Sequence, residues 1–229
     1  HLHVCDNCKY GLCNPLNCPL EKKLEFIWPI TRDWNHFQIE SELEKNPVLH
    51  DWEIIKSALN GIYWKDILSL HSRKYSQNLS ISKALSESLD KALIKVGSLR
   101  KVRIFSDGSN SNKPFVIEHK LNTLAIDFSF GHYQNIVWKL ARLAVSVGAN
   151  VNEKESHCTV GILILPESEL RKVGNFDSDS TWERALDYIK YMGHQWPVPI
   201  LLMGLKNPDI FVLQDNGKGS KPRCSIMYK

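Results

Sequence analysis

The sequence contains no long apolar run and only a small excess of one charge. None of its segments approaches the roughly 18 consecutive apolar residues of a membrane span, and no signal peptide is recognisable. We therefore expect a cytoplasmic, intracellular protein that does not associate with a membrane. The net charge is +4 and the isoelectric point is about 8.7. These values permit nucleic-acid binding but lack the strong basic excess that would itself indicate it.

Cysteine is scarce beyond the first 18 positions, because four of the six cysteines lie near the N-terminus. Cys5, Cys8, Cys13 and Cys18 have the spacing of a zinc knuckle, with Cys13 at the position that usually holds His. Four thiolates suit a tetrahedral structural Zn²⁺ site, and metal binding would supply the folding energy of so short a loop. An iron–sulfur cluster and disulfides are the alternatives. The module would either contact single-stranded nucleic acid or only anchor the N-terminus.

The chain is therefore expected to contain a Cys-rich module over residues 1–25 and one larger domain over residues 26–229. Apolar residues at helical or strand spacing predict the elements of the larger domain. We expect helices over 40–44, 51–59, 80–96, 133–147 and 182–192, and strands over 100–105, 115–119, 124–130 and 160–165. Residues 206–229 are polar and rich in Lys and Gly, so they either track phosphates or form a loose tail.

The segment 115–131 contains the candidate site residues. Its pattern predicts two short strands joined by a polar turn. Asp127 and Ser129 are two residues apart on the second strand, so both side chains fall on one face. Glu118 lies at the start of the hairpin and can fold back beside Asp127. A carboxylate in an apolar strand is costly to bury unless it is paired or bound to a metal, and two adjacent carboxylates favour Mg²⁺. Exposed residues at strand ends are the alternative.

The succession of elements resembles the BglII/BstYI-like type II restriction endonucleases of the PD-(D/E)xK nuclease superfamily. In that group an acidic residue opens the hairpin, and an Asp or Glu, one spacer and then Lys, Glu or Gln follow on the second strand. Glu118, Asp127 and Ser129 occupy these positions. The resemblance covers roughly residues 80–206 and ends in the apolar segment Trp196–Leu205. Ser129 departs from the pattern because it carries no charge.

The resemblance implies an α/β fold, with a mixed central β-sheet flanked by helices. It also implies a Mg²⁺-dependent, sequence-specific endonuclease that cuts double-stranded DNA as a homodimer. Glu118, Asp127 and the carbonyl of Phe128 would hold the metal. Ser129 would orient the attacking water, or Lys139 from the following helix would supply the missing positive charge.

Each of these expectations has an alternative. Lys139 and Arg142 lie outside the apolar stripe of their helix, so Lys139 is also compatible with a solvated surface lysine. Ser129 favours a nuclease-like fold that binds nucleic acid without cutting it. The Cys-rich module favours a nuclease that acts on RNA or on single strands.

Overall fold

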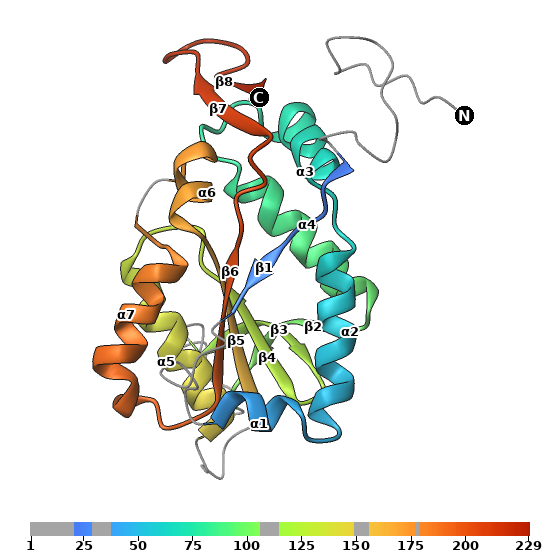
Figure 1. The fold of residues 1–229 in the computed structure, drawn as a ribbon, viewed down its shortest axis with the longest axis vertical. Helices are drawn as coiled ribbons and strands as arrows, with labels where there is room; N and C mark the ends of the chain where they lie inside the picture. The colour runs from blue at the N-terminus through green and yellow to red at the C-terminus, as the bar shows by residue number, and fades with distance from the viewer. Residues whose placement is uncertain (1–20, 29–37, 106–114, 149–155, 177–178) are drawn as a thin grey trace.

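The computed structural model describes residues 21–28, 38–105, 115–148, 156–176 and 179–229 (Figure 1). The four clustered cysteines lie outside the described residues, and so does most of the expected module over residues 1–25. The two remaining cysteines, Cys158 and Cys224, are both buried. Within the described part of the chain, no helix combines the length and apolarity needed to cross a bilayer.

The described chain opens with one short strand and a run of helices, which are followed by three strands and then by a region in which helices and strands alternate. The helices are α1 (Ile39–Leu43), α2 (Val48–Asn60), α3 (Trp64–Leu70), α4 (Ser82–Lys95), α5 (Gln134–Gly148), α6 (Ser168–Val173) and α7 (Trp182–Met192). A π-helical turn follows α3 (His71–Tyr75) and a 3-10 turn follows α7 (Gly193–Gln195). The strands are β1 (Phe26–Ile27), β2 (Leu99–Arg103), β3 (Val116–Leu121), β4 (Leu124–Phe128), β5 (Val160–Pro166), β6 (Ile200–Leu205), β7 (Phe211–Asp215) and β8 (Cys224–Tyr228).

Six strands form one mixed sheet in the order β1-β6-β5-β4-β3-β2. Strands β4, β5 and β6 are parallel, because α5 connects the first pair and α6 and α7 connect the second. Strands β2, β3 and β4 form an antiparallel meander, and β1 pairs antiparallel with β6. The mixed α/β sheet expected from the sequence is therefore confirmed.

Alternation along the central strands divides the core into two apolar layers. On β4, Leu124 and Ile126 pack in the layer that contains α2, α3 and α4, whereas Ala125 packs in the layer that contains α5 and α7. Every residue of β5 is buried, as its continuous apolar run predicts. Figure 1 shows α5 and α7 on one side of the sheet and α2 and α4 on the other.

The long helix before the hairpin agrees with its expected bounds to within two residues at each end. Leu85, Leu89 and Leu93 of α4 are fully buried, so their spacing of four identified the inward face. Gly97 follows the helix with a φ of 91°, a conformation that glycine adopts without steric cost.

The C-terminal segment is an ordered hairpin, not the loose tail that its composition allowed. Strands β7 and β8 pair antiparallel. The backbone N–H of Cys224 donates to the carbonyl of Ser76 at 3.1 Å, which attaches the hairpin to the segment after the π-helical turn. Leu213 and Cys224 join the core there, so apolar burial offsets the polar composition of the rest of the segment.

The turn between β3 and β4 is held by a buried aspartate of α2. Asp51 is 1% exposed. Its carboxylate accepts hydrogen bonds from the Thr123 hydroxyl at 2.7 Å, the Asn122 amide at 2.9 Å and the Thr123 backbone N–H at 3.3 Å. Burial raises the pKa of Asp51, but these hydrogen bonds outweigh it and leave the pKa below its usual value. The hairpin is thereby fixed to α2 at its closed end.

Candidate active site

The antiparallel pairing of β3 with β4 brings the two expected acidic residues together at the open end of the hairpin. His119 pairs with Ile126, and the next step in this register places Glu118 opposite Asp127. The backbone N–H of Glu118 also donates a hydrogen bond to the Asp127 carboxylate. The expectation that Glu118 folds back beside Asp127 therefore agrees with the structure.

Asp127 is completely buried and lies against two cations of α5. A terminal nitrogen of the Arg142 guanidinium lies 3.1 Å and 3.3 Å from the two carboxylate oxygens, and Lys139 Nζ lies 3.5 Å from one of them. Burial raises the pKa of Asp127; the charges of Lys139 and Arg142 oppose this rise without cancelling it, and the nearby Glu118 carboxylate adds to it. A further positive charge at this carboxylate would therefore be stabilising.

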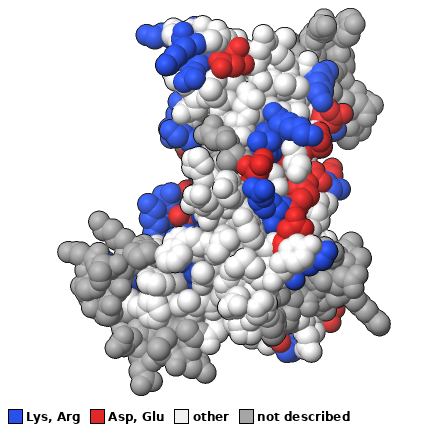
Figure 2. Space-filling model, turned by 90° about the vertical axis from the view of Figure 1, so that its left-hand side faces the viewer, with Lys and Arg blue, Asp and Glu red and all other residues white. Residues whose placement is uncertain are grey.

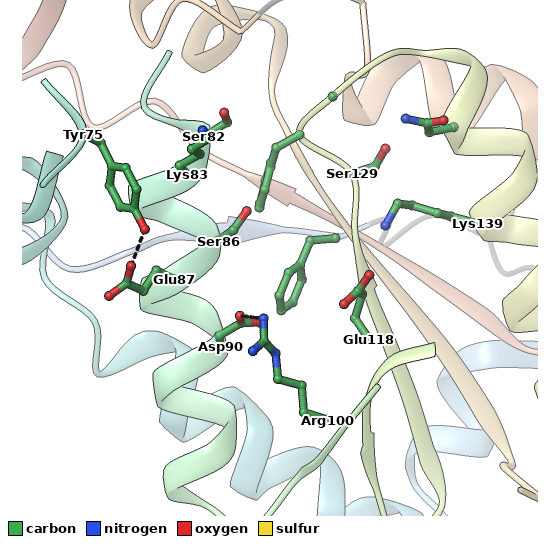
Figure 3. Close-up of a pocket in the computed structure, with 14 residues that line it drawn as sticks. Tyr75, Ser82, Lys83, Ser86, Glu87, Asp90, Arg100, Glu118, Ser129 and Lys139 are labelled. Atoms are coloured by element: carbon green, nitrogen blue, oxygen red, sulfur yellow. Dashed lines mark hydrogen bonds and ion pairs between the residues drawn. The ribbon is translucent and has the colours of Figure 1, made fainter. Parts of the chain in front are cut away.

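A cleft of about 650 Å³ lies beside these residues, between α4 and the start of α5. Glu118, Phe128, Ser129 and Lys139 line it, whereas Asp127 does not. Figure 3 shows Glu118 and Lys139 on the same side of the cleft, facing the residues of α4. The structure therefore places four of the five expected active-site residues on the cleft surface and the fifth behind them.

The charged side chains that line the cleft balance one another. Three are cations and three are carboxylates, namely Lys83, Arg100, Lys139, Glu87, Asp90 and Glu118. Figure 2 likewise shows Lys and Arg mixed with Asp and Glu across one face of the molecule, without a uniformly basic surface. The described cleft thus has little net charge with which to attract a polyanion, and a bound divalent cation would make it positive.

Ser129 has a structural partner in addition to its place at the cleft. It is 1% exposed, and its hydroxyl lies 2.8 Å from the hydroxyl of Ser180, which also donates to the Ser129 carbonyl at 3.2 Å. The Ser129 backbone N–H donates to the carbonyl of Ile164 on β5. The side chain therefore ties the end of β4 to the segment before α7.

Two contacts at this site were not expected from the sequence. Arg142 was assigned only to a face of its helix outside the apolar stripe, yet its guanidinium is the closest cationic group to Asp127. The available signal was its spacing from Lys139, because residues three apart on a helix share one side. Asp90 and Arg100 also line the cleft and form an ion pair at 2.7 Å.

The donor set suits a hard divalent cation. Mg²⁺ binds proteins through one or two carboxylates and keeps its other positions for water and substrate phosphates, and Glu118, Asp127 and the Phe128 carbonyl can provide such ligands. The described residues contain no cluster of three or more His, Cys, Asp or Glu side chains that could hold a metal without such additional ligands. The four cysteines proposed for Zn²⁺ are not among the described residues.

Comparisons with known proteins place this architecture in a family. The family model described as restriction endonuclease BglII/BglIII matches residues 40–205. A crystal structure of restriction endonuclease BglII complexed with a DNA 16-mer matches with a TM-score of 0.53 and 14% identity, covering 90% of this chain and 100% of that chain. A search of curated proteins found no match. The structural match shows the shared fold, and the family model shows the family relationship. The chain therefore belongs to the BglII/BglIII restriction endonuclease family and is a type II restriction-like endonuclease.

Proposed function

We propose that this endonuclease hydrolyses the phosphodiester bonds of double-stranded DNA in a Mg²⁺-dependent, sequence-specific reaction. The observation that carries the proposal is the cross-strand pair of Glu118 and Asp127 beside a cleft that Lys139 also lines. Two carboxylates can hold a hard divalent cation, and a nearby ammonium can balance negative charge on a phosphate, so these groups suit metal-assisted phosphodiester hydrolysis.

Glu118, Asp127 and the main-chain carbonyl of Phe128 would hold the Mg²⁺ ion. When bound, the ion would polarise the scissile phosphate and lower the pKa of an attacking water. The rise in the pKa of Asp127 supports this assignment, because a buried carboxylate that is costly to ionise is stabilised by an added cation.

Lys139 is the residue that we assign to the attacking water and the phosphate. Its ammonium lies 3.5 Å from Asp127 and its side chain lines the cleft. The ammonium can therefore donate hydrogen bonds to the attacking water and to the phosphate. Ser129 adds only a hydroxyl, and that hydroxyl is already bonded to Ser180. Arg142 does not line the cleft, so its role would be to balance the buried charge of Asp127.

Digestion of a supercoiled plasmid of known sequence with Mg²⁺ tests the proposal. Wild-type protein should give discrete fragments, Asp127→Ala should give none, and Glu118→Ala should cut more slowly than wild type. Binding of a labelled duplex should survive in Asp127→Ala, since removal of a negative charge near phosphate does not weaken electrostatic attraction. Equal cutting by wild type and both variants would place the active site elsewhere.

A second candidate is a protein of the same fold that binds duplex DNA without cutting it. Two observations favour it: Ser129 replaces a charged residue and is tied to Ser180, and Asp127 is covered by two cations. A gel shift without cleavage would support this function. In that case Ser129→Lys or Ser129→Glu should restore some activity, because the missing charged group would then be present.

Two further parts of the proposal concern assembly and the N-terminus. We propose a homodimer, since a palindromic DNA site mirrors a two-fold axis between subunits, and analytical ultracentrifugation would test it. We also propose that residues 1–25 form a separate module in which Cys5, Cys8, Cys13 and Cys18 bind one structural Zn²⁺. Elemental analysis should find about one zinc per chain, as expected for a closed four-thiolate site, and Cys8→Ser should lose it.

A further inference from the structure

A buried hydrogen-bond network leads from the core to the side of the cleft opposite Lys139. His119 on β3 is fully buried. Its Nε2 lies 2.8 Å from one carboxylate oxygen of Asp90 on α4, and its Nδ1 lies 2.9 Å from the hydroxyl of Ser98. A neutral imidazole that donates to Asp90 can accept from Ser98, so both contacts are satisfied without an added charge.

The second oxygen of Asp90 is bound by the strand neighbour of His119. Arg100 on β2 is the cross-strand partner of His119, and its guanidinium lies 2.7 Å from Asp90. One carboxylate of α4 is therefore held by both members of a cross-strand pair. This arrangement fixes the guanidinium in direction, because Asp90 itself cannot turn without losing its bond to the buried imidazole.

The guanidinium is directed into the cleft, and its ion pair with Asp90 does not engage all of its N–H donors. Arg100 lines the cleft, and its side chain is 48% exposed, against 17% for Asp90. Arg has five N–H donors in a planar fork that matches the oxygens of a phosphate. In Figure 3, Glu118 lies between Arg100 on one side and Lys139 on the other. A phosphate near Glu118 would thus have one cation on each side.

We infer that Arg100 is a phosphate-binding residue of this cleft and that Asp90 and His119 are positioning residues that hold its guanidinium toward the DNA backbone. This inference rests on the proposed function, since it requires duplex DNA in the cleft. It adds a group that the acidic-hairpin pattern does not contain, because Arg100, Asp90 and His119 lie on three different elements.

Arg103 provides a matched control for Arg100. Both are exposed arginines of β2, but Arg103 does not line the cleft. Binding of a fluorescein-labelled duplex should be measured by anisotropy in Ca²⁺ over a series of KCl concentrations. Arg100→Gln should weaken binding and lower the slope of log affinity against log salt by about one, as loss of one phosphate contact does. Arg103→Gln should change that slope by less than half as much. Equal slopes for wild type and Arg100→Gln, or equal losses in both variants, would overturn the phosphate assignment.

The positioning role makes a prediction whose sign differs from that of a simple charge effect. Asp90→Asn removes a negative charge from the cleft, so a charge effect alone would tighten binding and leave the turnover rate unchanged. If Asp90 instead orients Arg100, Asp90→Asn should slow turnover in Mg²⁺. Arg100→Gln should then reduce the turnover rate much less in the Asp90→Asn background than in wild type. Additive effects of the two changes would overturn the positioning role.

Changes to the imidazole separate positioning from stability. His119→Phe keeps a ring beside Phe128, whose centroid is 5.5 Å away, but loses the bond to Asp90. His119→Gln keeps an amide donor and should restore part of the DNA affinity, whereas Ser98→Ala removes only the other bond and should leave affinity near that of wild type. Thermal unfolding of each variant identifies losses caused by misfolding.

The proposed function fails if wild-type protein binds no duplex; the inference alone fails if wild type binds and Arg100→Gln binds equally well.

Discussion

Two buried aspartates, at opposite ends of one hairpin, have opposite electrostatic environments. Asp51 meets the β3–β4 turn and is surrounded by uncharged donors, and its pKa is lowered. Asp127 lies at the open end among two cations and a second carboxylate, and its pKa is raised. Both side chains are almost inaccessible, so burial alone does not distinguish them.

The difference agrees with the proposal that Asp51 stabilises the fold and that Asp127 serves the reaction. Hydrogen bonds to Asp51 favour its ionised form, so the folded state is more stable with this charge present. At Asp127 the folded state disfavours the charge, which is characteristic of a site completed by another cation or a substrate. The predictions below test this contrast, beginning with the largest effect.

The largest effect should come from Asp127→Asn. Cleavage in Mg²⁺ should fall by about 10³-fold, since the loss of one preorganised electrostatic group has effects of this size. Asp51→Asn is the matched change at the other end of the hairpin, and the rate of its folded fraction should remain close to wild type. Single-turnover plasmid cleavage measures both. Similar rate losses in the two variants would remove the functional distinction between the aspartates.

A smaller effect is expected at Lys139. Lys139→Ala should slow cleavage by about 10²-fold because it removes the cation that lies against Asp127 at the cleft. Ser129→Ala should cost much less, since its hydroxyl is bonded to Ser180 and carries no charge. Parallel rate measurements on the two variants test this order, and negligible effects of both in an active enzyme would refute the assignment of Lys139.

Asp51→Asn should chiefly affect stability. Replacement of the carboxylate weakens three hydrogen bonds at a buried site, so the free energy of unfolding should fall by about 1–3 kcal/mol. Urea denaturation at neutral pH measures this change. An unchanged midpoint would show that the turn is held mainly by the pairing of β3 with β4.

The smallest effect is the pH dependence of stability, which should differ in sign between the two sites. The stabilisation from the lowered pKa of Asp51 is present above about pH 4 and is lost as the pH falls through its folded pKa. The raised pKa of Asp127 makes stability decline as the pH rises above about 4 toward its folded pKa. At neutral pH, Asp127→Asn should therefore be as stable as wild type or slightly more stable, whereas Asp51→Asn is less stable. Thermal denaturation of wild type and both variants from pH 3 to pH 8 tests this prediction. Melting temperatures at neutral pH that shift in the same direction from wild type in both variants would contradict it.

The sequence was sufficient to predict those structural features that depend on a local pattern of residues. The spacing of Leu85, Leu89 and Leu93 identified the buried face of α4, and the polar turn with alternating residues placed Glu118 near Asp127. Both follow from the geometry of a single helix or a single hairpin.

Contacts between distant elements could not be inferred in this way. Asp90 and His119 are 29 positions apart, and Ser129 and Ser180 are 51 apart. Whether Arg142 points to solvent or to Asp127 depends on how α5 crosses the sheet, and helical spacing gives only its side of the helix. The contact of Arg142 with Asp127 therefore became evident only from the tertiary arrangement.

Strand β2 also affects how the molecule resists aggregation. It is the outermost strand on its side of the described sheet, and an uncovered outer strand can pair with another chain. Leu99 is 64% exposed there, but Arg100, Lys101 and Arg103 are exposed as well, and Lys101 has a φ of 53° that interrupts the extended backbone. Charge and irregular backbone both oppose strand addition. The same arginine that we assign to phosphate binding thus helps to keep the sheet from extending into a neighbouring molecule, and simultaneous neutralisation of these three cations should lower solubility even in a fully folded protein.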